Sequence, residues 1–312
     1  MNYTNAEFEL AYEEILKRIL FDKIPVQNPI AYILGGQPGA GKTQLQKIIL
    51  RKNKNVIAIN ADAYRQSHPR FESIQDEFGD DSPKYTQPFI NEIVERLISD
   101  LSDMKYNLII EGTLRTADVP LNTCHLLKNK NYKVELYLIS VKKDISYEST
   151  ILRYENNIRF GMIPRATAKE HHDKVVDAIC DNLDIIFKEN IFDDIKLYDR
   201  EGNNLYSIKD GISPVLVEKD KLFGAWSEDE ISSYKEIINT VIFLKQAREA
   251  PDLAQYILES SKRFSNAQSN LKSKTASRKF PLSRNQIKKN AKIISHTQEN
   301  QSQHNKDKSK SR

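Results

Sequence analysis

The sequence predicts an α/β fold in which a mostly parallel β-sheet is flanked by helices. Apolar runs of strand length alternate with segments of helical periodicity over roughly the first 210 residues. A glycine-rich segment at 36–43 joins the first of these runs to the helix that follows it. Every apolar run is far shorter than the roughly 18 residues of a membrane-spanning helix. We therefore expect a globular enzyme with no membrane partner.

The predicted elements follow one another in a regular order. An opening helix is predicted for residues 6–21, because Phe8, Tyr12 and Ile15 fall on one helical face. The predicted strands are 30–34, 56–60, 108–111, 134–141 and 195–198, and the helices between them are about 44–50, 85–104, 119–130, 144–160 and 168–189. The alternation stops after Gly211, and a helical region is predicted for about 227–261.

The glycine-rich segment matches the phosphate-binding motif G-x-x-x-x-G-K-[S/T]. Glycines permit the backbone turns that aim successive N–H groups at a phosphate. The lysine supplies a charge for the β- and γ-phosphates, and the hydroxyl of the last residue is a ligand for Mg²⁺. The motif therefore predicts that ATP and Mg²⁺ bind at Gly36, Gln37, Pro38, Gly39, Ala40, Gly41, Lys42 and Thr43, with Thr43 as the metal ligand.

Further charged residues follow the strands of the predicted sheet. Asp62 comes just after the second strand and Glu111 ends the third, with Arg115 close behind. Arg153 and Arg165 lie in and after the helix that follows the fourth strand. Ligands of open α/β sheets bind beyond the carboxyl ends of the strands, so these side chains should converge beside the phosphate loop. Phosphoryl transfer needs cations and a carboxylate that takes the acceptor's proton, and Asp62 is our candidate for that base.

Other interpretations of these residues stay open at this stage. Asp62 could instead cap a helix, Glu111 could be a turn residue, and the arginines could form surface ion pairs. Two further chemistries are disfavoured. His171, His172 and Asp173 are adjacent on a helix and do not form one zinc-binding face, and the chain has no Gly-x-Ser-x-Gly nucleophile elbow. The two cysteines fit a reduced core, and we expect a cytoplasmic protein.

The charge of the chain is unevenly distributed. The formal net charge is +4, yet residues 262–312 hold 14 Lys and Arg against 2 Asp and Glu, which leaves −8 for the rest. The C-terminal segment is rich in Ser, Asn, Gln and Lys and poor in aromatic residues, so we expect a disordered tail. A basic tail of this kind could bind nucleic acid, and that binding would be electrostatic.

Five segments of the sequence form a specific combination: Gly35 to Thr43, Asn60-Ala61-Asp62 with His68-Pro69, Ile110 to Thr116, Thr150 to Glu155, and Arg165-Ala166-Thr167. In their order and spacing, over about residues 6–208, they resemble the zeta-toxin family, the kinases of bacterial epsilon–zeta toxin–antitoxin systems. The resemblance implies a P-loop kinase fold and ATP-dependent phosphorylation of the 3′-hydroxyl of UDP-N-acetylglucosamine, which would block peptidoglycan precursor synthesis. An epsilon-type antitoxin is the implied protein partner.

The resemblance also implies roles for individual residues. Lys42 and Thr43 would bind nucleotide and Mg²⁺, and Asp62 would be the base. The implied stabilisers of the transferring phosphate are Arg153 and Arg165, and the implied sugar-nucleotide ligands are Glu92, Glu111, Thr113 and Arg115. Asn60-Ala61 departs from the more acidic stretch expected before the base, and the spacing around Glu92 also differs.

The chain is therefore divided into a P-loop kinase domain at 1–225, a helical region at 226–261 and a basic low-complexity tail at 262–312. Two alternative functions remain. The first is a kinase for another small hydroxyl acceptor, such as an antibiotic or a nucleoside. The second is a nucleic-acid-associated NTPase tethered by its tail, although Gly112 stands where a motor ATPase would carry a second carboxylate after Glu111.

Overall fold

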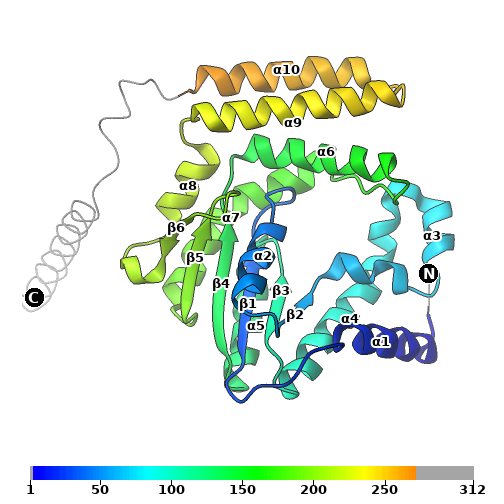
Figure 1. The fold of residues 1–312 in the computed structure, drawn as a ribbon, viewed down its shortest axis with the longest axis vertical. Coiled ribbons are helices and arrows are strands. Elements are labelled where there is room, and N and C mark those ends of the chain that lie inside the picture. Colours follow the sequence, from blue (N-terminus) through cyan, green and yellow to red (C-terminus); the bar gives the residue numbers. More distant parts are fainter. Residues whose placement is uncertain (1–2, 272–312) are drawn as a thin grey trace, which may run out of the picture.

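The structure is a computed structural model and describes residues 3–271 (Figure 1). The remainder of the predicted tail, 272–312, lies outside the described residues. One six-stranded sheet has the order β2-β3-β1-β4-β5-β6. All neighbouring strands are parallel except β5 and β6. The strands are β1 Ile30–Gly35, β2 Ile57–Ile59, β3 Leu108–Glu111, β4 Lys133–Ile139, β5 Asp194–Tyr198 and β6 Asn204–Ser207.

Helices flank this sheet, so the predicted mostly parallel α/β architecture is confirmed (Figure 1). The α-helices are α1 Asn5–Ile19, α2 Thr43–Lys52, α3 Phe71–Phe78, α4 Ser82–Asp103, α5 Asp118–Asn129, α6 Lys143–Arg159, α7 Lys169–Glu189, α8 Val215–Phe223, α9 Glu228–Ala247 and α10 Leu253–Ser269. Short 3₁₀ helices occupy Ala61–Ser67 (η1), Gly79–Asp81 (η2) and Ile208–Asp210 (η3). The sequence did not predict β6, α3 or α8 as separate elements.

The central strands read as nearly continuous apolar runs because helices bury both of their faces. Leu34 of β1, Ile109 of β3 and Leu136 of β4 are fully buried. Both cysteines are reduced and buried, as predicted. The parallel register places the carboxyl ends of β1, β2 and β3 at one edge, so the residues that follow these strands lie close together.

The C-terminal helices continue the core of the sheet domain. A hydrophobic cluster joins Trp226 and Tyr234 to Leu34 of β1 and Leu45 of α2. In Figure 1, α9 and α10 (yellow and orange) lie over α6 (green). The predicted division at residue 225 therefore does not separate two hydrophobic cores.

Helix α10 also extends beyond the predicted limit of the helical region at residue 261. It ends at Ser269, and Ala267 is buried in the same cluster. Residues 262–269 were predicted to belong to the tail because their basic and polar side chains are usually solvated. In the structure, one face of α10 packs against the sheet domain. Across residues 3–271, the helices are too short or too polar to cross a membrane.

Candidate active site

The phosphate loop connects β1 to α2 and takes backbone conformations that favour glycine. Gly36, Gly39 and Gly41 have φ angles of +137°, +75° and +103°. A Cβ atom at Gly39 would lie 2.0 Å from the backbone oxygen of Ser146 on α6. The loop therefore needs glycine at this position both for its torsion and for its close contact with α6.

Lys42 ends the loop, and its side chain folds back over it. Its ammonium donates to the backbone oxygens of Gly36 at 2.8 Å and Gln37 at 3.4 Å. Burial lowers the pKa of Lys42 to about 8, and the nearby Glu111 carboxylate opposes part of this change. Thr43 begins α2 and is exposed to solvent, so its hydroxyl is accessible to a cation.

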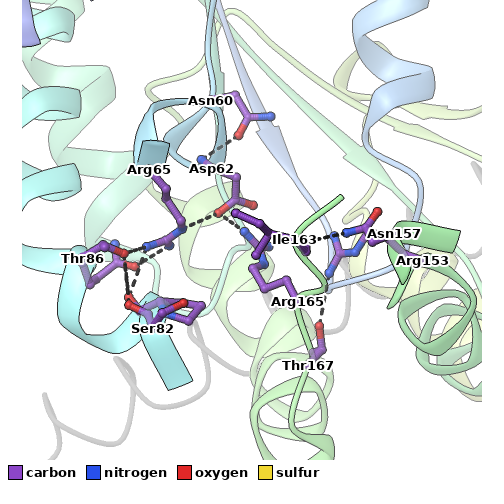
Figure 2. Close-up of polar contacts among 12 residues, drawn as sticks. Asn60, Asp62, Arg65, Ser82, Thr86, Arg153, Asn157, Ile163, Arg165 and Thr167 are labelled. Carbon is purple, nitrogen blue, oxygen red and sulfur yellow. Dashed lines mark hydrogen bonds and ion pairs between the residues drawn. The ribbon is translucent and has the colours of Figure 1, made fainter. Parts of the chain in front are cut away.

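Asp62 lies in η1, directly after β2, and faces two arginines (Figure 2). Its carboxylate forms ion pairs with Arg165 and with Nε of Arg65, the latter at 3.2 Å. Partial burial favours the neutral acid, but these ion pairs outweigh it and hold the pKa of Asp62 below its usual range. The helix cap is supplied by Asn60, whose side chain accepts from the Asp62 backbone N–H at 3.0 Å. Asp62 itself is therefore free of the capping role that the sequence left open.

Arg65 fixes Asp62 relative to α4, a function that sequence reasoning did not assign to it. Its guanidinium donates to the Thr86 hydroxyl at 2.8 Å, to the side chain of Gln87 at 2.7 Å and to the backbone oxygen of Pro83 at 3.1 Å (Figure 2). The same side chain therefore bonds the candidate base and three groups of the neighbouring helix.

Arg153 and Arg165 approach the candidate base from the opposite side to Arg65. Arg153 of α6 donates to the Thr167 hydroxyl at 3.2 Å, beside Arg165 in the loop that leads to α7 (Figure 2). A pocket of about 350 Å³ opens here. Its lining includes Asp62, Arg65, Phe71, Gln75, Ser82, Arg153, Asn157, Ile163 and Arg165. The pocket therefore offers an acceptor substrate one carboxylate and three guanidinium groups.

Glu111 stands at the end of β3, between the phosphate loop and Asp62. Its carboxylate accepts from the side chain of Gln46 on α2 at 2.6 Å. Burial raises the pKa of Glu111, although the charge of Lys42 opposes that effect. The ammonium of Lys42 interacts electrostatically with Glu111, Arg153, Asp62 and Arg165. The structure thus brings five of the predicted residues together at one edge of the sheet.

Thr113 and Arg115 lie in the loop after β3, with different exposure. Thr113 is half-buried, whereas Arg115 is exposed and lies near His171 of α7. Leu114 between them has a φ angle of +58°, and its backbone oxygen accepts from the side chain of Asn182 at 2.9 Å. That hydrogen bond from α7 fixes the turn that carries both candidate substrate ligands.

Glu92 is the predicted residue that the structure does not bring to this edge. It lies exposed on α4, and its carboxylate accepts from the hydroxyl of Tyr3 at 2.7 Å. The Tyr3 ring packs against His68 and Phe89 at the start of α1. The predicted substrate contact at Glu92 is therefore not supported. Glu92 lies on the face of α4 that is turned toward the N-terminal segment.

His171 and His172, near the start of α7, differ in burial and in their contacts. His172 is buried, with Nε2 2.9 Å from the Ser146 hydroxyl and Nδ1 3.1 Å from the Asp173 carboxylate, while His171 is exposed. The hydroxyl of Ser146 also accepts from the side chain of Gln37 at 3.2 Å. His172 thus belongs to a buried network that connects α7 to the phosphate loop through α6.

A second arginine that sequence reasoning missed contacts the phosphate loop directly. Arg200 follows β5 and donates to the backbone oxygen of Ala40 at 3.0 Å and to that of Gly39. Its position beyond the carboxyl end of a parallel strand was a signal that could have identified it, by the rule that identified Asp62 and Glu111.

The parallel sheet, the glycine-rich loop and the adjoining charged cluster define a P-loop kinase-like protein. The family model described as Zeta toxin matches residues 14–210. The chain therefore belongs to the zeta-toxin family, as its motifs indicated. Family and fold together support a phosphotransferase.

Curated relatives and solved structures agree with this assignment. The chain is 42% identical to Toxin PezT of Streptococcus pneumoniae serotype 4 over 73% of this chain and 92% of that protein. It is 39% identical to Toxin zeta of Streptococcus pyogenes over 81% of this chain and 89% of that protein. A structure from the characterization of the PezAT chromosomal toxin–antitoxin system of Streptococcus pneumoniae aligns with a TM-score of 0.72 and 36% identity, covering 78% of this chain and 98% of that one. The AvrRxo1-ORF1:-ORF2 complex, at 15% identity and a TM-score of 0.52, shares the fold.

Proposed function

We propose that this protein is an ATP-dependent kinase that phosphorylates the 3′-hydroxyl of UDP-N-acetylglucosamine and acts as the toxin of a toxin–antitoxin system. One observation carries the proposal. The Asp62 carboxylate, paired with Arg165, lies between the phosphate loop and a pocket of about 350 Å³. A donor phosphate held by the loop and an acceptor hydroxyl in the pocket would meet at this carboxylate.

The phosphate loop and α2 would hold the nucleotide. The Lys42 ammonium and the backbone N–H groups of the loop supply positive charge for the β- and γ-phosphates. Thr43 is exposed, and its hydroxyl is an oxygen donor of the kind that suits Mg²⁺. The ion would neutralise phosphate charge when bound.

The acceptor would be oriented by the carboxylate of Asp62. Because its pKa is depressed, Asp62 is ionised at neutral pH and can accept a hydrogen bond from the attacking hydroxyl. As the oxygen bonds to phosphorus, its proton passes to Asp62 and the nucleoside diphosphate leaves. Arg153 and Arg165 would stabilise the charge on the transferring group. Glu111, Thr113 and Arg115 would contact the sugar nucleotide.

The family membership supports the toxin role, and a protein antitoxin of the epsilon type is the partner we propose. A similar relative was characterised as part of the PezAT toxin–antitoxin system. Co-expression with a candidate antitoxin, followed by size-exclusion chromatography, tests whether the two proteins form a complex and whether growth inhibition is relieved.

Mass spectrometry of the reaction tests the substrate. The protein is incubated with ATP, Mg²⁺ and UDP-N-acetylglucosamine, and a product with one additional phosphate is expected. Antibiotics and nucleosides serve as alternative acceptors, and DNA and RNA are added in parallel reactions. Phosphorylation of a different acceptor would replace the proposed substrate. ATP turnover that depends on nucleic acid would contradict the kinase function and favour the tail-tethered NTPase.

A further inference from the structure

Arg200 stands in the turn between β5 and β6 and lies across the outside of the phosphate loop. Its Nε donates to the backbone oxygen of Ala40 at 3.0 Å, and its Nη2 donates to the backbone oxygen of Gly39. The same Nη2 also donates to the hydroxyl of Ser149 on α6 at 2.9 Å. One guanidinium therefore joins the loop, α6 and the turn after β5.

These contacts fix two consecutive peptide planes of the loop. In a planar trans peptide the C=O group and the N–H group of the next residue point in opposite directions. With the Ala40 oxygen held by Arg200, the N–H of Gly41 points away from Arg200, toward the inner side of the loop. With the Gly39 oxygen held likewise, the N–H of Ala40 turns inward and donates to Gln37 at 3.1 Å. Arg200 thus orients the Gly41 N–H toward the side where a phosphate would bind, and the Ala40 N–H closes a turn within the loop.

The loop has a physical need for such a contact. Its glycines give it more backbone freedom than other residues would, so ordering it costs more conformational entropy. Contacts that hold the loop before ligand arrives reduce the cost of binding. Arg200 is itself well fixed, because the side chain of Asp199 accepts from Asn203 at 2.8 and 2.9 Å and thereby braces the turn.

The charge of Arg200 is compensated only in part, by the Glu201 carboxylate, which raises the pKa of Arg200 against the effect of burial. Among residues 3–271, no carboxylate lies within ion-pair distance of its guanidinium, and its partners are two carbonyls and a hydroxyl. Burial lowers the pKa of Arg200 to about 10, so the group still carries a positive charge at neutral pH. An anionic ligand of the loop would be attracted by this charge.

We propose that Arg200 is a positioning residue of the nucleotide site, which holds the phosphate loop in its binding conformation and adds positive charge behind it. The inference rests on the ATP-binding part of the proposed function and not on the identity of the acceptor. It predicts that Arg200 contributes to nucleotide affinity, while acceptor affinity and turnover at saturating ATP depend on the residues around Asp62.

The test is isothermal titration of the full-length protein with a non-hydrolysable ATP analogue and Mg²⁺, without acceptor. Arg200→Ala should weaken binding by at least about tenfold, which corresponds to about 1.4 kcal/mol. The affinity of Arg200→Lys for the analogue should lie between those of Arg200→Ala and the wild type. A lysine ammonium keeps the charge but lacks the planar fork that reaches both carbonyls. Ser149→Ala removes only the third contact of Arg200 and should bind the analogue within about twofold of the wild type, since the two loop carbonyls stay held.

Steady-state kinetics provide the second measurement. Across the variants, KM for ATP should follow the same ranking as the Kd for the analogue. The value of kcat at saturating ATP and KM for the acceptor should each change by less than about threefold. Analogue binding by Arg200→Ala within twofold of the wild type, or a loss confined to kcat, would overturn the inference while leaving the kinase function intact. A wild-type protein that binds no analogue would instead contradict the proposed function. If Arg200→Ala does not fold, the comparison of Arg200→Lys with the wild type decides the question.

Discussion

Replacing Arg263 by alanine should destabilise the protein through a buried carboxylate more than 100 residues away in the chain. Glu148 of α6 is fully buried, and Arg263 of α10 donates to it through Nε at 2.9 Å and Nη2 at 2.6 Å. The hydroxyl of Tyr256 supplies a third hydrogen bond at 2.8 Å. In the Arg263→Ala variant, Glu148 would lose its cationic partner and two of these three bonds.

The expected loss follows from the burial of the pair. Removing one partner of a buried ion pair costs about 3–5 kcal/mol, and we take about 3 kcal/mol because the Arg263 side chain is 18% exposed. The entropy of unfolding is about 2 cal/mol/K per residue, or roughly 0.6 kcal/mol/K over the described residues. The melting temperature should therefore fall by about 5 °C.

Differential scanning calorimetry at neutral pH measures this change, with two matched variants. Lys188→Ala breaks an exposed pair with Asp184, so its melting temperature should shift by less than about 1 °C. The double variant Glu148→Gln/Arg263→Ala removes both charges and should recover most of the loss. A melting temperature of Arg263→Ala equal to that of Lys188→Ala would refute the reasoning, as would a double variant less stable than Arg263→Ala.

Three further predictions concern the site and its support. Asp62→Asn should lower kcat by about 10²–10⁴-fold with ATP affinity nearly unchanged, because the amide cannot take the proton; near wild-type turnover would remove the role of Asp62 as base. Arg153→Ala and Arg165→Ala should each lower kcat by about 10²-fold with little change in KM for ATP; a change confined to KM would show that both act only in binding. Burial raises the pKa of Glu218 from 4.5 to about 7. As pH rises from 4.5 to about 7, Glu218 therefore loses its proton in the unfolded state while it keeps the proton in the folded state. The free energy of unfolding should fall by roughly 3 kcal/mol over this range. In thermal melts from pH 5 to 8, the Glu218→Gln variant should not show this decline in stability. If its melting temperature depends on pH as that of the wild type does, the assignment to Glu218 is wrong.

The sequence predicted the part of the site that follows from sheet topology. Parallel strands end at one edge, so the chain positions of Asp62 and Glu111 after apolar runs were enough to place them together. The glycine spacing and its strand and helix flanks likewise predicted the phosphate loop. These signals are local in sequence, and each depends on only a few neighbouring residues.

The features that were missed depend on contacts between distant segments. Arg200 follows a predicted strand, but nothing near it in the sequence indicates that its partners are the backbone oxygens of Gly39 and Ala40. Glu92 was given a substrate role by the family resemblance, but the direction of its side chain depends on how α4 packs against the N-terminal segment. Arg263 was counted with a solvated tail, since nothing near it in sequence indicates that Glu148 is its partner.

Helix α6 explains why the C-terminal helices belong with the kinase-like body. One side of α6 carries Ser146, Ser149 and Arg153, at helical spacings of three and four, and these contact Gln37, Arg200 and Thr167. The other side carries two buried glutamates seven residues apart. Glu148 pairs with Arg263, and Glu155 pairs with Lys245 at 3.0 Å and with Arg248 at 2.7 Å.

The family model ends at residue 210, before any of these basic residues. Without α9 and α10, Glu148 and Glu155 would lose all of their cationic partners. Because an ion pair of this kind stabilises mainly by preventing an uncompensated buried charge, loss of the two helices should destabilise α6 of this chain. The helix that supports the phosphate loop and presents Arg153 therefore has ion-pair partners beyond the residues matched by the family model, and the packed body of this chain extends through α10.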